Sequence, residues 1–483
     1  MGKFAALFLA CPMKNRGLDR FDLVIGAFLV ASYVAVGMMP FAPQKFGDGF
    51  FHPEAKTLAQ AVRGSAPWTD VGIARAPAPV VYYAIPYLMV PPGSSENRYW
   101  QAAFIWTAAW MVVCLCLIRR IGDELGGPLT GKLSAILSLL TPFWAYYSYG
   151  INAEPPAFLG VVLFTYGWLR WQGPAQEPGR SSRWAWLAAG GLCLFVLSRP
   201  NALLLLIFAL LAAARMYRIG NPDAIRAARS TVQVVAVTAL IVAASYAVVR
   251  ALPRYQQVDY FVWVMFPGAF QYRSEPWDWR YWDKVRRKGS ADYEAWDRTY
   301  KEIGRQAKDS GVPTYDLLKK WLLRDIVHNP GAWIRMAGVR TLALHVSLVN
   351  SQRPEAFRVG PVSGWVVNLV FHVLVNAVNL LLIAGALWFL FDRRRNLASY
   401  WPLWGPWLSL LVFHAVVYAE PRYLFPSRPG ITVMAAAALT PATARLCARF
   451  RDRLCARTAL ISGAQDRSEM MTSVSVTRNE ERS

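Results

Sequence analysis

The sequence predicts an all-α polytopic membrane protein, and two features of its composition lead to that fold class. Of its 483 residues, 55% are hydrophobic and only 17% are charged, whereas about 25% of the residues in a soluble domain are charged. The apolar residues also lie in long blocks with few charges, and such blocks match the ~20 residues of a bilayer-spanning helix. These features exclude a soluble globular enzyme, a coiled coil and a disordered chain.

The apolar blocks predict about ten membrane-spanning helices. Basic residues concentrate in the cytoplasmic loops of membrane proteins, and here they gather in alternate loops, whereas the short turns at 150–154 and 199–201 hold only Arg199. This asymmetry places both termini in the cytoplasm. The net charge of +22 therefore reflects topology, and no nucleic-acid partner is expected. The predicted spans are 21–41, 99–118, 131–149, 155–171, 184–198, 202–217, 231–252, 361–391, 397–418 and 428–444.

Residues 184–217 could form one overlong helix or two short ones. A single helix would place the basic loop at 215–229 outside the cell and would reverse the membrane orientation of every later segment. Two helices keep that loop inside, and Pro200 supplies the break because proline interrupts a helix. The sequence therefore predicts that the chain turns at Arg199-Pro200-Asn201.

Two outward segments are long, at 42–98 and at 253–360. The second is rich in Trp and Tyr and is expected to form a small aromatic-rich domain on the outer face. Its aromatic residues could lie on the lipid surface as a belt or could form a platform for sugar rings, and both interpretations stay open. Apolar residues from Leu317 to Ile326 recur at helical spacing and predict an amphipathic helix. The expected domains are 1–252, 253–360, 361–446 and a polar tail at 447–483.

Two familiar kinds of site are not supported. Gly126 to Lys132 has the spacing of a phosphate-binding loop, but Leu133 stands where Ser or Thr should bind magnesium, and no strand precedes it. The sequence has neither an HExxH motif nor paired CxxC motifs, so it supports no metal site, and no cofactor is expected. His372 and His414 lie within predicted spans and are expected to pack there.

On this topology, polar residues from four loops gather at the outer face. Each has a structural explanation when taken alone: Asp48 precedes a glycine as turn residues do, and Glu154 precedes a proline, as is favourable at the start of a helix. Charged groups that converge beside a membrane are costly, however, and are usually functional. The candidates are Lys45, Asp48, His52, Arg75, Glu154, Arg199, Glu420, Arg422 and Tyr423.

This set of residues fits group transfer from a lipid phosphate. A carboxylate at the outer surface can act as a general base toward an acceptor hydroxyl. Arginines can bind the phosphate and stabilise the charge that develops on it as it leaves. The lipid tail would lie against the membrane spans, and the aromatic outer segment would cover the sugar.

The motifs around these residues resemble those of the GT-C superfamily of glycosyltransferases, which includes protein mannosyltransferases and lipid A aminoarabinose and galacturonic-acid transferases. The resemblance covers most of the chain and implies that Asp48 is the catalytic base and that Glu154 is a second acidic residue. His52-Pro53-Glu54 departs from the Tyr and Ala of many members, so the substrate class does not carry over. The motifs are Asp48–Phe51, Arg75-Ala76-Pro77 through Tyr82-Tyr83, Thr141-Pro142 through Glu154, Arg199-Pro200 and Pro421-Arg422-Tyr423.

The sequence thus predicts an inverting glycosyltransferase of a bacterial inner membrane. Its donor would be a polyprenyl-phosphate sugar and its acceptor a lipid or glycan on the outer face. Two alternatives are a transporter or flippase of lipid-linked sugars and an O-antigen polymerase or ligase. The predicted contacts to the donor phosphate and the substrates are made by Arg422, Arg199, Arg75, Tyr423, Lys45, His52 and Glu420.

Overall fold

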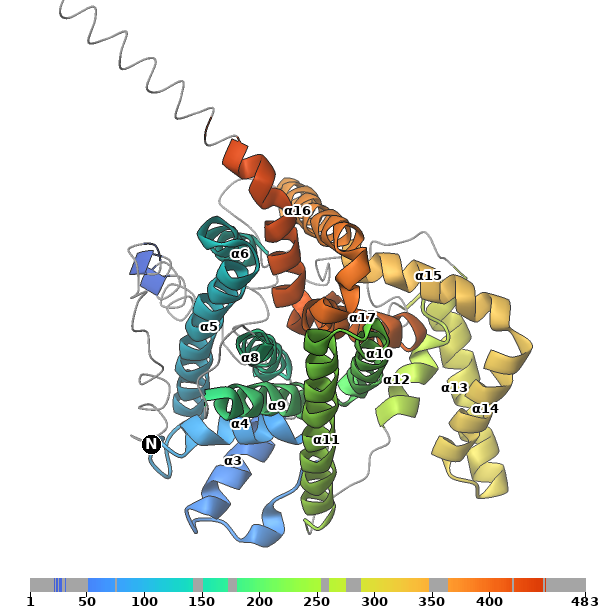
Figure 1. Cartoon of the computed structure of the whole chain (residues 1–483). Helices are drawn as coiled ribbons and strands as arrows, with labels where there is room; N and C mark the ends of the chain where they lie inside the picture. Colours follow the sequence, from blue (N-terminus) through green and yellow to red (C-terminus); the bar gives the residue numbers. More distant parts are fainter. Residues whose placement is uncertain are drawn as a thin grey trace, which may run out of the picture.

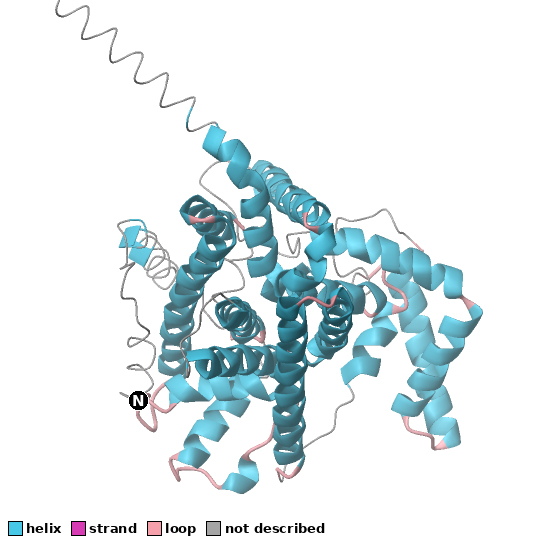
Figure 2. Cartoon of the chain, in the orientation of Figure 1, coloured by secondary structure: helices cyan, strands magenta, loops and turns pink. Residues whose placement is uncertain are grey.

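The described part of the chain consists of helices joined by loops and turns and contains no strand (Figure 2). The structure is a computed structural model. It describes residues 21, 23, 24, 26, 27, 31, 51–73, 76–141, 151–172, 180–252, 260–274, 288–346, 364–418, 421–445 and 448. The all-α class expected from the sequence is therefore confirmed for these residues.

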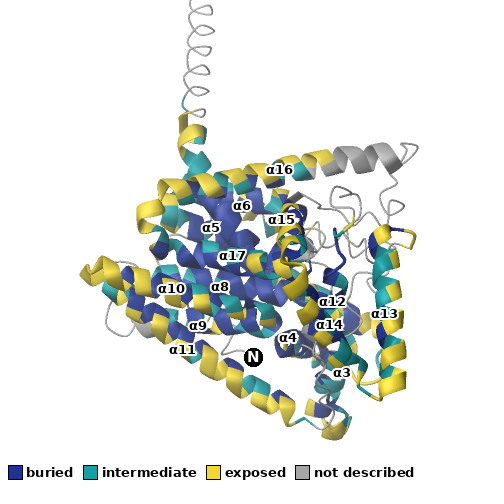
Figure 3. Ribbon diagram, turned by 90° about the vertical axis from the view of Figure 1, so that its right-hand side faces the viewer, coloured by how far each residue is buried: buried dark blue, intermediate teal, exposed yellow. Residues whose placement is uncertain are grey.

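Most helices form one bundle around a large apolar core. Figure 3 shows the buried residues concentrated where α5, α6, α8 and α17 meet, and exposed residues along α11 and α16. Apolar side chains such as Leu210, Leu240 and Val248 stay exposed on this bundle, as expected for helices that face lipid. The bundle contains α5 (Glu96–Gly126), α6 (Pro128–Leu140), α8 (Glu154–Gln172), α9 (Arg180–Ser198), α10 (Leu204–Ile219), α11 (Pro222–Arg250), α16 (Gly364–Asp392), α17 (Trp401–Val416) and the helix at 428–445.

Among the described residues, three helical segments are long and apolar enough to cross a membrane. They are Glu96–Gly126, Pro200–Ile219 and Pro222–Arg250. A fourth is added if Asn376–Asp392 and Arg394–Val416 count as one span, and these two are bent by 110°. The chain is therefore a membrane protein by the length and composition of its helices. The count of ten spans and the orientation stay predictions.

The predicted break between the fifth and sixth apolar blocks is confirmed. Helix α9 ends at Ser198, a short 3-10 helix η3 spans Pro200–Leu203, and α10 begins at Leu204. Arg199 has φ −136° and ψ 88°, outside the helical region. Pro200 cannot donate the hydrogen bond that would continue α9. The chain therefore turns here, as the distribution of basic residues required.

Helices α8 and α9 touch backbone to backbone through glycines. A Cβ added at Gly160 would lie 2.6 Å from the backbone nitrogen of Phe195, and one at Gly191 would lie 2.7 Å from the carbonyl oxygen of Gly160. A Cβ at Gly167 would lie 2.7 Å from the backbone nitrogen of Ala188. Real Cβ atoms do not approach so closely, so only glycine permits this contact. The start of α8 is thereby held against the end of α9.

Glycines also account for the conformation of residues 126–132, whose spacing resembles a phosphate-binding loop. Gly127 joins α5 to α6 with a φ of 83°, which favours glycine. A Cβ at Gly131 would lie 2.6 Å from the carbonyl oxygen of Arg119, so α6 packs closely on α5. This segment is a tight turn between two packed helices.

A second hydrophobic cluster forms beside the bundle (Figure 1). Its helix α14 confirms the amphipathic helix predicted for this segment, with Leu318 and Leu322 buried. Trp321 stacks on Phe270 at a centroid distance of 5.2 Å. These aromatic residues therefore belong to a core, which neither the belt nor the sugar platform anticipated. The helices are α12 (Tyr260–Gly268), α13 (Ala291–Ser310), α14 (Thr314–His328) and α15 (Pro330–Val346).

A buried arginine joins this cluster to the bundle. Arg340 on α15 donates hydrogen bonds to the carbonyl oxygens of Val416 (2.6 Å) and Ala415 (3.3 Å) at the end of α17 and to that of Gly268 at the end of α12. Burial lowers the pKa of Arg340 to about 10, so the guanidinium stays charged near neutral pH. Carbonyl groups at helix ends carry partial negative charge, which stabilises a cation there.

We predict that Gly191→Ala destabilises the protein, because the new methyl group would meet the backbone of α8. Overpacking of this kind costs about 1–3 kcal/mol. Gly190→Ala is the matched control, because a Cβ at Gly190 meets nothing within 4 Å and alanine favours a helix by up to about 1 kcal/mol. Thermal unfolding in detergent measures both variants. Equal melting temperatures for the two would contradict the tight contact.

Candidate active site

Glu154 is the first residue of α8 and is buried, with 1% of its surface exposed. Its backbone N–H donates to the side-chain oxygen of Asn152 (3.0 Å), which caps the helix start. The hydroxyl group of Tyr83, on α4 (Pro77–Tyr87), donates to the carbonyl oxygen of Asn152 (2.9 Å) and fixes this turn. Helix α4 therefore sets the position of the carboxylate.

Arg199 forms an ion pair with Glu154. The side chains are 15% and 2% exposed, so solvent screens the pair little. The two residues are far apart in sequence and meet because α8 and α9 pack antiparallel: one residue begins α8 and the other follows α9. Breaking such a pair by removing one charge typically costs about 3–5 kcal/mol.

The aromatic ring of Tyr423 packs against the guanidinium of Arg199. Tyr423 lies in η7 (Pro421–Ser427), and the guanidinium carbon of Arg199 is 4.9 Å from the centre of its ring. This is a cation–π contact, which strengthens when it is shielded from water. Phe425 of the same segment stacks on Phe158 of α8 at 4.7 Å, which holds η7 against the bundle.

His414 supports Tyr423 from behind. The two rings stack with centroids 4.3 Å apart. His414 Nδ1 donates to the carbonyl oxygen of Tyr418 (3.1 Å), which leaves Nε2 to accept from the side-chain amide of Asn201 (2.6 Å). His414 is 3% exposed, so the expectation that it packs within the fold is confirmed. Asn201 follows Arg199 after one residue, so this bond also fixes the turn that carries the arginine.

His52 belongs to a separate cluster at the start of α3 (Phe51–Val62). Its Nε2 donates to the carboxylate of Glu96 (2.7 Å), and its Nδ1 accepts from the hydroxyl group of Tyr87 (2.7 Å). Its ring stacks on Trp100 at 4.6 Å, and Lys56 also pairs with Glu96. Both ring nitrogens have protein partners, so the geometry fits an anchor for α3. The predicted contact of His52 with substrate stays a prediction.

The structure thus brings three predicted site residues together: Glu154, Arg199 and Tyr423. Four others lie outside the described residues, namely Lys45, Asp48, Arg75 and Glu420. The backbone of Arg422 lies in η7 beside Tyr423, and its side chain also lies outside the description. The roles expected for these residues stay predictions.

Sequence reasoning did not identify four residues that position the site: Tyr83, Asn152, Asn201 and His414. Three had a signal that could have been used, because Tyr83 lies in the Arg75-to-Tyr83 motif, Asn152 lies in the Thr141-to-Glu154 motif and Asn201 ends the predicted turn. His414 had none, since its contact depends on how α17 packs. In the part of the chain that the structure describes, no group of three or more His, Cys, Asp or Glu side chains could hold a metal ion.

Comparisons with known proteins add a structural likeness. No protein-family model and no curated protein match the chain. The chain is similar to the oligosaccharyltransferase AglB from Archaeoglobus fulgidus, solved with an inhibitory peptide and a dolichol-phosphate, at a TM-score of 0.49 and 14% identity over 90% of this chain and 52% of that chain. It is also similar to ArnT from Cupriavidus metallidurans bound to undecaprenyl phosphate, at a TM-score of 0.35 and 12% identity over 86% of this chain and 76% of that chain.

The apo form of the Archaeoglobus fulgidus oligosaccharyltransferase gives a TM-score of 0.47 at 13% identity, over 92% of this chain and 53% of that chain. The chain therefore spans about half the length of the archaeal oligosaccharyltransferases that it matches. Likeness at these scores and identities establishes no activity for this chain, so its chemistry must be argued from its own residues.

We predict strong energetic coupling between Glu154 and Arg199. Each single variant, Glu154→Gln or Arg199→Gln, should lower the free energy of unfolding by about 3–5 kcal/mol, because each leaves one buried charge without its partner in the pair. The double variant should lose less than the sum of the two, since it removes both charges. A double-mutant cycle of denaturant unfolding in detergent measures the coupling. Additive losses would show that the two side chains do not form the pair.

We also predict that His52 makes stability depend on pH. Burial lowers the pKa of His52 below 6.5, against the opposing effect of its hydrogen bond to Glu96. The unfolded chain therefore binds a proton at higher pH than the folded one, and the free energy of unfolding falls as the pH drops below 6.5 through the folded pKa.

The measurement is the melting temperature between about pH 7.5 and about pH 5.5. His52→Gln should reduce its pH dependence, whereas His328→Gln, at an exposed histidine on α14, should leave it as in the wild type. An unchanged pH dependence in His52→Gln would contradict the neutral, buried state of this ring.

Proposed function

We propose that the protein is a membrane glycosyltransferase that moves a sugar from a polyprenyl-phosphate donor to a lipid or glycan acceptor on the outer face of a bacterial inner membrane. One observation supports this most strongly: the guanidinium of Arg199 is held between the carboxylate of Glu154 and the ring of Tyr423. A fixed arginine suits phosphate, because its planar group can donate two parallel hydrogen bonds.

The donor phosphate would bind beside Arg199, with Arg422 from the same segment as Tyr423 and with Arg75. Glu154 holds the Arg199 guanidinium in place before the donor arrives, so little reorganisation is needed when charge develops on the leaving phosphate. Lys45 and Glu420 would contact the substrates from the flanking segments. The lipid tail would lie along the exposed apolar faces of the bundle.

In the proposed reaction, Asp48 is the general base. Its carboxylate accepts the proton of the acceptor hydroxyl while the acceptor oxygen bonds to the anomeric carbon. The bond from that carbon to the phosphate oxygen breaks on the opposite side, so the configuration inverts. The electron pair leaves with the polyprenyl phosphate, whose negative charge Arg199 and Arg422 stabilise. No metal ion is required by this scheme.

The second hydrophobic cluster closes one side of the proposed site. Tyr418 belongs to this cluster and Tyr423 packs against it, and Arg340 ties it to the end of α17. A rigid aromatic wall beside the phosphate-binding arginine suits a sugar ring, whose apolar face packs on aromatic side chains. This arrangement would also exclude water, which would otherwise hydrolyse the donor.

We predict that Asp48→Asn lowers sugar transfer by about 10²–10⁴-fold, because asparagine keeps the shape but cannot accept the proton. Asparagine also occupies the same turn positions as aspartate, so folding and donor binding should be preserved. The assay is transfer of labelled sugar from a short-chain polyprenyl-phosphate donor, with donor binding measured in parallel. Asp309→Asn, at an exposed position on α13, is the matched control. Near-normal turnover by Asp48→Asn would overturn the proposed mechanism and favour a transporter.

A further inference from the structure

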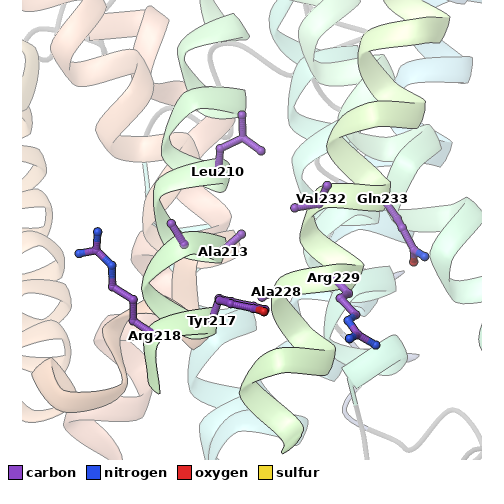
Figure 4. Close-up of a pocket in the computed structure, with 9 residues that line it drawn as sticks. Leu210, Ala213, Tyr217, Arg218, Ala228, Arg229, Val232 and Gln233 are labelled. Atoms are coloured by element: carbon purple, nitrogen blue, oxygen red, sulfur yellow. The ribbon is translucent and has the colours of Figure 1, made fainter. Parts of the chain in front are cut away.

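An apolar groove of about 640 Å³ runs between α10 and α11. Both helices belong to segments long and apolar enough to cross a membrane, so the groove opens toward the surroundings of the bundle. Its floor is made of small buried residues, Ala213 and Ala228, and its walls include Leu210, Tyr217 and Val232 (Figure 4). The small floor residues leave room between the helices that no side chain of either helix fills.

Two arginines stand at one end of this groove. Figure 4 shows Arg218 and Arg229 at the same end as Tyr217 but on opposite sides of the groove, with their guanidinium groups turned away from the apolar floor and from each other. Both are exposed. A sharp turn brings the two helix ends together here, because Gly220 has a φ of 78° and Asn221 caps α11 by accepting from the backbone N–H of Ala224 (2.7 Å).

The charge at this end is strongly positive. Residues 215–229 contain one acidic residue, Asp223, and four arginines, namely Arg215, Arg218, Arg226 and Arg229. Asp223 lies 3.8 Å from Arg226 and is 92% exposed, so it does not neutralise Arg218 or Arg229. The groove is apolar and has a basic end. This combination is complementary to a molecule with an apolar chain and an anionic headgroup.

We propose that this groove binds an anionic phospholipid of the surrounding leaflet. One acyl chain lies against Leu210, Tyr217 and Val232, and the anionic headgroup lies at the basic end of the groove, where the positive charges of Arg218 and Arg229 attract it. The membrane positions the lipid at this depth, since basic groups near helix ends lie at the headgroup level. The bound lipid fills the space between α10 and α11 and links the two helices.

This site is distinct from the proposed active site. Helix α10 has 16 residues and starts just after Arg199, so its other end lies about 24 Å away along the helix axis. A donor bound at Arg199 cannot at the same time place its phosphate at Arg218. The inference therefore stands whether or not the proposed transfer reaction is correct.

The test is native mass spectrometry of the full-length protein with phosphatidylglycerol or phosphatidylcholine of identical acyl chains. The wild type should retain phosphatidylglycerol in preference to phosphatidylcholine. Arg218→Gln/Arg229→Gln should weaken phosphatidylglycerol binding by about 30-fold, because each arginine near an anionic headgroup contributes about fivefold. Arg250→Gln, an exposed arginine at the other end of α11, is the matched control and should retain the lipid.

A second variant tests the groove without changing charge. Ala214 is exposed and lines the groove, so Ala214→Trp fills it with no cost to buried packing, and this variant should also lose the lipid. Melting temperatures show whether each variant is folded. Equal retention of the two lipids by the wild type would overturn the proposal. So would undiminished phosphatidylglycerol binding by both groove variants, or a dimer that buries this groove.

Discussion

The close contact between α8 and α9 is the constraint on which the site depends. Helices with ordinary side chains at their interface pack about 8–10 Å apart, and the glycines at 160, 167 and 191 allow the two backbones to approach more closely. Because the helices are antiparallel, the first residue of α8 and the residue after α9 meet at one end. Glu154 and Arg199 can therefore pair in a buried setting only while this contact holds.

The remaining parts of the site follow from that pair. With Arg199 fixed, Tyr423 can cover its face, and the stacked ring of His414 together with Asn201 holds both the tyrosine and the turn. Each of these groups comes from a different segment, so the arrangement is a product of tertiary packing. The buried guanidinium of Arg340 then fixes the second hydrophobic cluster beside it.

The sequence was most informative where a feature depends on residues close together in the chain, such as a proline or a group of basic residues. Pro200 and the basic residues around it predicted the break between α9 and α10, and the topology built on that break predicted that Glu154, Arg199 and Tyr423 would meet. His414 could not be assigned to the site, because no local pattern in the sequence reveals which residues of other helices it would contact. The aromatic residues of 253–360 suggested a belt or a sugar platform, but Trp321 packs in a core, since burial depends on partners distant in sequence.

We propose that packing of α8 against α9 presents Arg199 to the phosphate of a lipid-linked donor. The most direct measurement is photo-crosslinking with a short-chain polyprenyl phosphate that carries a diazirine next to its phosphate, followed by mass spectrometry of the labelled peptides. We expect label on the peptides that contain Arg199 and residues 421–427, and loss of this label in a folded Arg199→Gln variant. Label confined to other segments, or label at these peptides that is unchanged in Arg199→Gln, would contradict it.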